Sequence, residues 1–260
     1  MLEADEPAAF EVVEGTGEPP LIVVCDHASN RIPRALASLG LDERQLDDHI
    51  AWDAGAAAVA RRLGARFGAS VVLAQYSRLV IDLNRAPGDA TVIPRISDGV
   101  LIPGNIGLSP EARAARVRTL FEPYHAAIEA LIQRRTTPAQ SPAFVGVHSF
   151  TPRFHRTARS WQIGVLWDRD PRIAVPLLGA LRAAGVRVGD NQPYSGKHPA
   201  DYCIDTHAEP RGIAHVGIEI RQDLIADEAG QAHWAGVLGD ALEGILRDPG
   251  LYHAPYDPRR

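Results

Sequence analysis

Short apolar runs rich in β-branched residues alternate in this chain with segments of helical periodicity, and this alternation restricts the fold more than any other feature. The runs that we expect to be strands cover residues 20–25, 70–74, 78–83, 143–148, 163–167 and 215–220. Most of them are continuously apolar, which is the pattern of strands covered by helices on both faces. The sequence therefore predicts an α/β fold with a mixed or mostly parallel sheet flanked by helices.

The segments between these runs include the expected helices, at residues 54–68, 109–135, 170–185 and 229–246. Asp53 is placed to cap the first helix, and Pro123 predicts a kink in the second. The loop 85–109 is long and contains glycine and proline, as lids and binding loops often do, and whether it is a lid stays open. Because no repeat or linker divides the chain, we expect residues 1–260 to form a single catalytic domain.

Composition and charge exclude several classes of function. The formal net charge is −5, which gives no basic surface for nucleic acid. No apolar run reaches the roughly 18 residues of a membrane span, and the acidic start lacks the features of a signal peptide. Cys25 and Cys203 make no disulfide framework and are expected to be reduced thiols. We therefore expect a cytoplasmic enzyme without a nucleic-acid or membrane partner.

Ligand-type side chains lie where the predicted strands end. His27 follows the run 20–25, His148 ends the run 143–148, and Asp53 lies on a third segment, HIAWDAG. Ligands of open α/β sheets bind at the carboxyl ends of strands. Two imidazoles and one carboxylate there predict a three-ligand zinc site with a fourth position open for water. Glu219 is a carboxylate inside the apolar strand 215–220, which needs a reason of its own.

Each of these residues also has a simpler interpretation. A histidine at a strand end can be a hydrogen-bonded loop residue, and Asp53 can be only a helix cap. Glu219 can pair structurally with Arg221, its neighbour on one strand face. Ligands on separate segments are a weaker signal than a compact local motif, so the residue pattern alone leaves both interpretations open.

Five stretches, in order, carry a resemblance to a known family: VVCDHASNRIP, HIAWDAGA, SRLVIDLNRAP, GVHSFTP and GIEIRQDLI. They resemble the N-formylglutamate amidohydrolases, over nearly the whole chain from about Leu21 to Leu246. The resemblance implies a zinc-dependent amide hydrolase with an α/β fold akin to zinc carboxypeptidases and zinc muramoyl-alanine amidases. It also implies that His27, Asp53 and His148 are the metal ligands and that Glu219 is the general base.

The expected reaction is hydrolysis of a linear amide, the C–N bond of an N-formyl or other N-acyl amino acid such as N-formylglutamate. One zinc ion would lower the pKa of a bound water towards about 7, and Glu219 would carry that water's proton to the departing amine. His207, in CIDTHAEPRG, is a candidate donor to the oxyanion. The donor set also tolerates iron and manganese, so the metal's identity stays open.

Carboxylates of an acidic substrate require cationic partners, and arginine binds them bidentately. Arg85 and Arg221 are the candidates, with Asn84 in support. The alternative for Arg85 is a structural pair with Asp82 or Asp89. The oligomeric state stays open.

Two motifs depart from the family's usual pattern. The first reads CDHAS where formate-releasing enzymes typically have PHSG, and the second reads HIAWD in place of DTDW. These departures indicate a divergent branch, so the acyl group and the amino acid of the substrate stay open. The rival hypotheses are the same zinc chemistry on a different N-acyl amino acid or small peptide-like amide, and a non-catalytic metal- or ligand-binding relative. A structural protein without metal would require His27, Asp53 and His148 to lie far apart.

Overall fold

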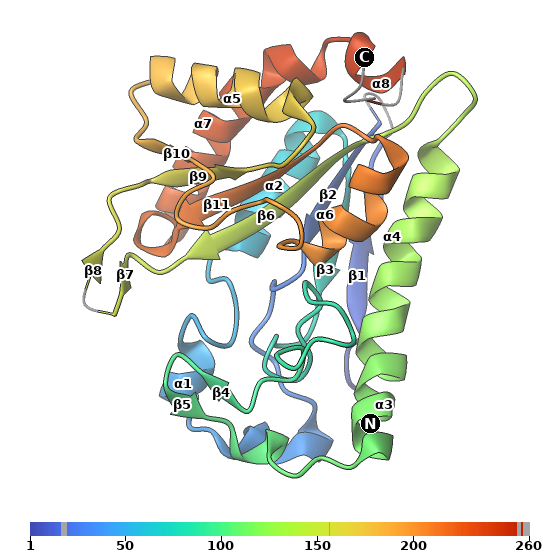
Figure 1. Cartoon of the computed structure of the whole chain (residues 1–260), viewed down its shortest axis with the longest axis vertical. Helices are drawn as coiled ribbons and strands as arrows, with labels where there is room; N and C mark the ends of the chain where they lie inside the picture. Colours follow the sequence, from blue (N-terminus) through green and yellow to red (C-terminus); the bar gives the residue numbers. More distant parts are fainter. Residues whose placement is uncertain (17–19, 156, 254–255, 257–260) are drawn as a thin grey trace.

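The computed structural model describes residues 1–16, 20–155, 157–253 and 256, and its centre is a seven-stranded sheet (Figure 1). The strands follow the order β1-β3-β2-β6-β11-β9-β10. Their bounds are Phe10–Val13 (β1), Leu21–Cys25 (β2), Ser70–Ala74 (β3), Ala143–Phe150 (β6), Ile163–Leu166 (β9), Val188–Asp190 (β10) and His215–Arg221 (β11). The sheet is mixed but mostly parallel, as predicted, because four of its six strand pairs are parallel and only β1–β3 and β9–β11 are antiparallel.

Parallel pairing in the middle of the sheet brings the carboxyl ends of several strands together. β3, β2, β6 and β11 are parallel neighbours, so their carboxyl ends meet at one side of the sheet. The register of β6 and β11 sets His148 directly beside Glu219. The sheet thus gathers side chains that lie far apart in the sequence.

Helices cover both faces of the sheet (Figure 1). One face packs against α2 (Ala56–Phe67), α5 (Pro171–Ala183) and α7 (Glu228–Leu246). The other packs against α4 (Glu122–Arg135) and α6 (Tyr202–His207). Successive residues of β2 therefore enter different cores, Val23 the first and Val24 the second. Burial of each such side chain stabilises the fold by about 1.5–3 kcal/mol, which explains the continuously apolar strands.

The predicted helix 109–135 is helical along its whole length but changes its hydrogen bonding before Pro123. It consists of α3 (Pro110–Arg116), a π-helical turn at Val117–Phe121, and α4. In the turn, the N–H of Glu122 bonds to the carbonyl of Val117. Proline has no N–H to donate, so a local change of hydrogen-bond register occurs where the sequence predicted a kink.

Two expectations about local structure were wrong. Residues 78–83 form turns instead of a strand, although their apolar side chains are buried. The cap of α2 is Gly55, with φ +81°, and not Asp53, whose side chain is directed elsewhere. A Cβ at Gly55 would lie 2.3 Å from the carbonyl oxygen of Ile225, so the tight approach requires glycine there.

The loop 85–109 and the segment around α1 (Glu43–Asp47) lie beyond the carboxyl edge, below the sheet in Figure 1. The loop contains a hairpin of β4 (Ile96–Ser97) and β5 (Val100–Leu101). A second hairpin, β7 (Arg153–Phe154) with β8 (Thr157–Ala158), follows β6. The last helix is α8 (Gly250–His253). Across the described residues, every helix is too short or too polar to cross a membrane.

Arg116 fixes the loop against α3. Its side chain is 2% exposed and donates to the carbonyl of Val80 at 2.8 Å, to Asn105 Oδ1 at 2.6 Å and to the carbonyl of Gly104 at 3.2 Å. Burial lowers the pKa of Arg116 to about 10, since these partners are neutral oxygens. The buried guanidinium thus joins the turn after residue 78 to the last part of the loop.

Candidate active site

A cavity of about 260 Å³ at the carboxyl edge brings together His27, Asp53, His148 and Glu219, and we call it the active-site pocket. His27 follows β2, His148 is near the end of β6 and Glu219 is near the end of β11. Asp53 precedes α2, and its backbone N–H bonds to the carbonyl of His27 at 2.9 Å. The structure therefore brings the four predicted residues to one place.

The three predicted metal ligands converge through their side chains. His27 Nδ1 lies 3.3 Å from Asp53 Oδ2, and His148 Nδ1 lies 3.0 Å from the same oxygen. All three side chains are buried, and one donor atom from each lies within 4.8 Å of the others. Burial alone would raise the pKa of Asp53, but His27 and His148 outweigh it and hold that pKa far below its usual range. Asp53 is therefore a carboxylate here.

Asp82 binds the ring nitrogen of His27 that faces away from Asp53. Its Oδ1 lies 2.8 Å from His27 Nε2 and also accepts from the backbone N–H of Asn84 at 2.9 Å. Its Oδ2 accepts from Arg78 Nη2 at 2.6 Å and Nε at 3.1 Å. Burial raises the pKa of Asp82, yet Arg78 and His27 lower it further, so the group stays ionised. An acceptor at Nε2 leaves the lone pair of His27 on Nδ1, which faces Asp53.

His148 has a different second partner. Its Nε2 lies 3.6 Å from Asp26 Oδ2, and Tyr124 donates its hydroxyl to Asp26 Oδ1 at 2.5 Å. Among the described residues, both His148 Nε2 and Asp26 Oδ2 lack a hydrogen-bond partner. Asp26 therefore faces His148 and not its sequence neighbour His27, while Asn30 donates to the carbonyl of Leu46 and to Asp47 Oδ1.

This donor set fits a zinc ion. Two imidazole Nδ1 atoms and one carboxylate oxygen face one another beside a cavity, which is the composition of a catalytic zinc site with an open position. The far nitrogen of His27 is bound by a carboxylate, as is usual for a metal-ligating histidine.

Glu219 borders the ligand cluster but is not part of it. Its side chain is 7% exposed, and Oε2 has no hydrogen-bond partner within the described part of the chain. Burial raises the pKa of Glu219 to about 7, and the nearby Asp53 adds to the effect while His148, His27 and Arg78 oppose it. A carboxyl with that pKa can both accept and release a proton near neutral pH.

Of the predicted substrate-binding residues, Arg85 and Asn84 line the pocket and Arg221 does not. Arg85 is 45% exposed on its side chain and approaches Asp82 at 3.7 Å, so the structural pair foreseen as the alternative is present but loose. Asn84 Oδ1 accepts from the backbone N–H of Cys203 at 2.9 Å. Arg221 donates from Nε and Nη2 to the two carboxylate oxygens of Asp223, at 2.7 and 3.1 Å, and from Nη1 to the carbonyls of Arg159 and Trp161, so its donors are occupied away from the pocket.

The structure also places His207 away from the active-site pocket. Its Nε2 lies 2.9 Å from His125 Nδ1, and His125 Nε2 donates to the carbonyl of Leu83 at 2.9 Å. The two rings are nearly coplanar, at 17°. Cys203 completes a group of possible metal ligands with them, but the His125–His207 contact is a direct hydrogen bond that leaves no room for an ion between the nitrogens. Burial, with His207 adding to it, lowers the pKa of His125 to about 3.

Sequence reasoning did not assign three residues to the site. Arg78 and Tyr194 line the active-site pocket, and Asp82 binds His27. Asp82 interrupts an apolar run just as Glu219 does, so the same signal was available. Tyr194 follows β10 in a proline- and glycine-containing stretch that has no distinguishing pattern.

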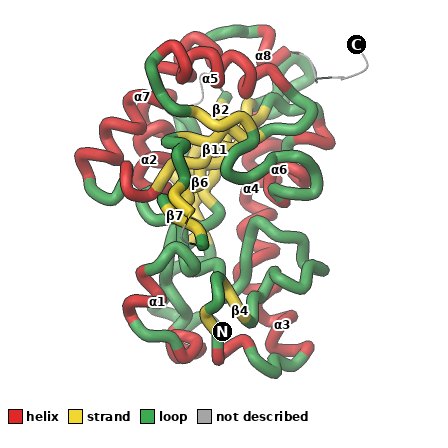
Figure 2. The backbone as a smooth tube through the Cα atoms, turned by 60° about the vertical axis from the view of Figure 1, so that its left-hand side comes forward, coloured by secondary structure: helices red, strands yellow, loops and turns green. Residues whose placement is uncertain are grey.

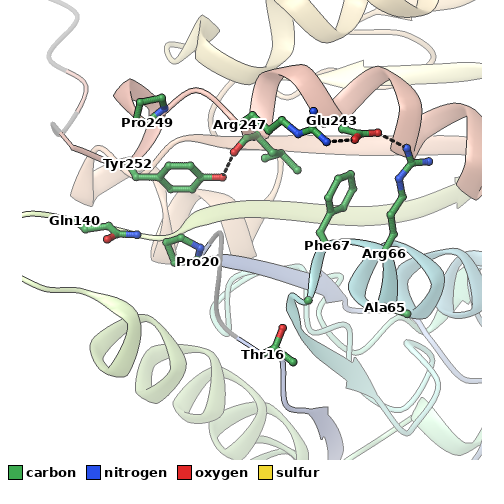
Figure 3. A pocket seen from close by; sticks show the side chains of 12 residues that line it. Thr16, Pro20, Ala65, Arg66, Phe67, Gln140, Glu243, Arg247, Pro249 and Tyr252 are labelled. Carbon is green, nitrogen blue, oxygen red and sulfur yellow. Dashed lines mark hydrogen bonds and ion pairs between the residues drawn. The ribbon is translucent and has the colours of Figure 1, made fainter.

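A larger cavity, of about 750 Å³, lies near the ends of α2 and α7 (Figure 3). Its charged side chains neutralise one another, because Glu243 pairs with both Arg66 and Arg247. Tyr252 donates its hydroxyl to the carbonyl of Leu246. Arg66, Glu243, Arg247 and the Tyr252 hydroxyl are thus already partnered, whereas the smaller pocket gathers the possible metal ligands.

Comparisons with known proteins agree with this fold. The chain is similar to the gene product Atu2144 from Agrobacterium tumefaciens, with a TM-score of 0.90 and 38% identity over 94% of this chain and 97% of that one. It shares its fold with N-formylglutamate amidohydrolase from Ralstonia eutropha JMP134, with a TM-score of 0.63 and 21% identity over 94% and 98% of the two chains. A search of curated proteins gave no match.

Fold and pocket together define an α/β protein with a group of possible metal ligands at the carboxyl edge of its sheet. The family model of N-formylglutamate amidohydrolase matches residues 19–226. The chain belongs to the N-formylglutamate amidohydrolase family, as the sequence resemblance predicted. Membership supports a hydrolase that acts on a small amino-acid derivative.

Proposed function

We propose that this chain hydrolyses the amide bond of a small acidic N-acyl amino acid, with zinc held by His27, Asp53 and His148 and with Glu219 as general base. The observation that carries the proposal is the meeting of two Nδ1 atoms, one carboxylate and the unbonded Oε2 of Glu219 at one pocket. Family membership supports an amide as the bond cleaved.

Zinc bound at these residues would supply a water of lowered pKa and polarise the amide carbonyl. Glu219 Oε2 accepts the proton of the attacking water while the new C–O bond forms. It then delivers that proton to the amine nitrogen while the C–N bond breaks, since an amide anion is a very poor leaving group. The products are a carboxylic acid and a free amine, formate and glutamate in the case of N-formylglutamate.

Arg85 binds the substrate's carboxylate in this proposal. Its guanidinium reaches the pocket, and its contact with Asp82 at 3.7 Å leaves its donors available for a bidentate pair. Asn84 supports it through its side-chain NH₂, since its Oδ1 is already bound. The proposal takes residues 1–260 as one catalytic domain and locates it in the cytoplasm, which the two buried free thiols support.

Formate release from N-formyl-L-glutamate tests the proposal, with zinc-loaded protein, chelated protein and chelated protein given zinc again. We expect release that stops on chelation and returns with zinc. A folded, zinc-bound protein without release would exclude this substrate, and formyl, acetyl and succinyl amino acids would then identify the acyl group.

Glu219→Gln tests the base. We expect turnover to fall about 10²–10⁴-fold with zinc still bound. Glu228→Gln is the matched control, because Glu228 is 90% exposed on its side chain and belongs to α7. Nearly full turnover in a folded Glu219→Gln protein would show that another group takes the proton.

A further inference from the structure

A second cavity, of about 480 Å³, adjoins the active-site pocket. The two cavities share four lining residues, His49, Arg78, Arg85 and Tyr194. We call the second cavity the outer pocket. A ligand whose amide lies beside His27 and Glu219 can therefore extend past Arg85 into it.

The outer pocket has apolar walls contributed by separate segments. Ile96 of β4 is 62% exposed and Phe154 of β7 is 41% exposed, and both line the cavity together with Tyr194, 42% exposed. Figure 2 shows β7 and β4 on the same side of the molecule, one above the other beyond the sheet. Large apolar side chains that remain exposed around one cavity mark a binding surface.

The two hairpins also approach each other at the rim through polar side chains. Asp98, in the β4–β5 turn, lies 3.3 Å from His49 Nε2 through Oδ2 and 4.0 Å from His155 Nε2 through Oδ1. The polar groups of the rim thus pair with one another, and the apolar side chains stay available to a ligand.

Arg159 contacts three aromatic rings beside the outer pocket. Its guanidinium carbon lies 4.8 Å from the ring centre of Tyr194, 4.9 Å from that of Phe154 and 5.6 Å from that of Phe150. It also donates to the hydroxyl of Tyr194 at 3.0 Å. Rings held in this way are ordered before a ligand arrives, which reduces the entropy cost of binding.

We propose that the outer pocket is a subsite for an apolar or aromatic group of the substrate, so that the preferred substrates are N-acyl amino acids larger than N-formylglutamate. This inference rests on the proposed function. A formyl group is a single carbon and offers almost no apolar surface for Ile96 and Phe154 to bury. An apolar group attached on either side of the scissile amide supplies such a surface, and the outer pocket shares Arg85 and Tyr194 with the active-site pocket.

Equilibrium binding tests the subsite without turnover. Calorimetry on zinc-loaded Glu219→Gln protein compares N-formyl-L-glutamate with N-benzoyl-L-glutamate, whose ring is on the acyl side, and with N-formyl-L-phenylalanine, whose ring is on the amine side. We expect at least one aromatic ligand to bind about tenfold tighter than N-formyl-L-glutamate. The tighter ligand identifies the side of the amide that faces the outer pocket.

Ile96→Ser and Phe154→Ala should each weaken the preferred aromatic ligand several-fold more than N-formyl-L-glutamate. Ile106→Ser is the matched control, since Ile106 is 51% exposed on the same loop but does not line the outer pocket. Equal effects on both ligands, or no aromatic preference in the parent protein, would refute the subsite. Formate release from N-formyl-L-glutamate would still test the proposed function, so the two failures are distinguishable.

Discussion

Replacement of Asp82 by asparagine should weaken zinc binding although Asp82 is not a ligand. In the native chain, Asp82 Oδ1 binds His27 Nε2 and the N–H of Asn84, while Oδ2 binds Arg78. An asparagine has one oxygen for these two roles. If that oxygen faces His27, the amide NH₂ faces the donors of Arg78, and two donors repel.

The opposite orientation of the amide is also unfavourable. With the oxygen towards Arg78, the NH₂ group donates to His27 Nε2, and the proton of the imidazole moves to Nδ1. Nδ1 faces Asp53 and would then lack the lone pair that a metal needs. Either orientation costs a charge-assisted contact, and loss of such a partner typically lowers metal affinity 10–100-fold, or about 1.4–2.7 kcal/mol.

Competition with a chromophoric chelator measures this loss. Asp89→Asn is the matched control, because Asp89 lies in the same region, its side chain hydrogen-bonds only to Thr91 among the described residues, and it does not line the active-site pocket. Metal-free unfolding of both variants separates damage to the fold from damage to the site. Zinc affinity within twofold of the parent in a folded Asp82→Asn protein would refute the role given to His27 Nδ1.

Three further substitutions or conditions test the fold around the site. Arg116→Met should lower the free energy of unfolding by about 2–4 kcal/mol in urea, because buried oxygens lose their donor, while the exposed Arg118→Met should have little effect. Because the pKa of His125 falls to about 3 on folding, the unfolded chain binds its proton first as the pH drops below about 6.5. This group should therefore remove roughly 2–3 kcal/mol between pH 7 and pH 4.5, and an equally steep loss in His125→Asn would contradict the assignment. Gly55→Ala should cost at least about 1–2 kcal/mol because of its left-handed backbone, and Gly88→Ala, which has open space around it, should be nearly neutral unless the strain argument fails.

Sequence patterns predicted the long elements well and the short ones poorly. β2, β3, β6, β9 and β11 coincide closely with apolar runs, because burial on both faces leaves an unbroken signal. β1 and β10 are edge strands, and β4, β5, β7 and β8 contain only two residues each. Strands that short have no periodicity to detect, and tertiary contacts determine them.

The turn at residues 78–83 shows why an apolar run can mislead. Its side chains are as buried as those of a strand, but Asp82 donates its backbone N–H to the carbonyl of Val92 rather than to a neighbouring strand. The Arg78–Asp82 pair then holds the turn beside His27. Burial is visible in the sequence, whereas the hydrogen-bond partner is not.

The same distinction separates the ligands from the residues that orient them. His27, His148 and Glu219 could be found because strand ends and a carboxylate within an apolar strand are local signals. Which carboxylate faces which imidazole depends on side-chain direction in three dimensions: Asp26 is adjacent to His27 in the sequence but faces His148. Arg221 and His207 failed to reach the pocket for a similar reason, since Asp223 and His125 offer them nearer partners. The parallel order β2-β6-β11 fixes where the ligand-bearing strand ends meet, and competition among nearby polar groups decides which other side chains join them.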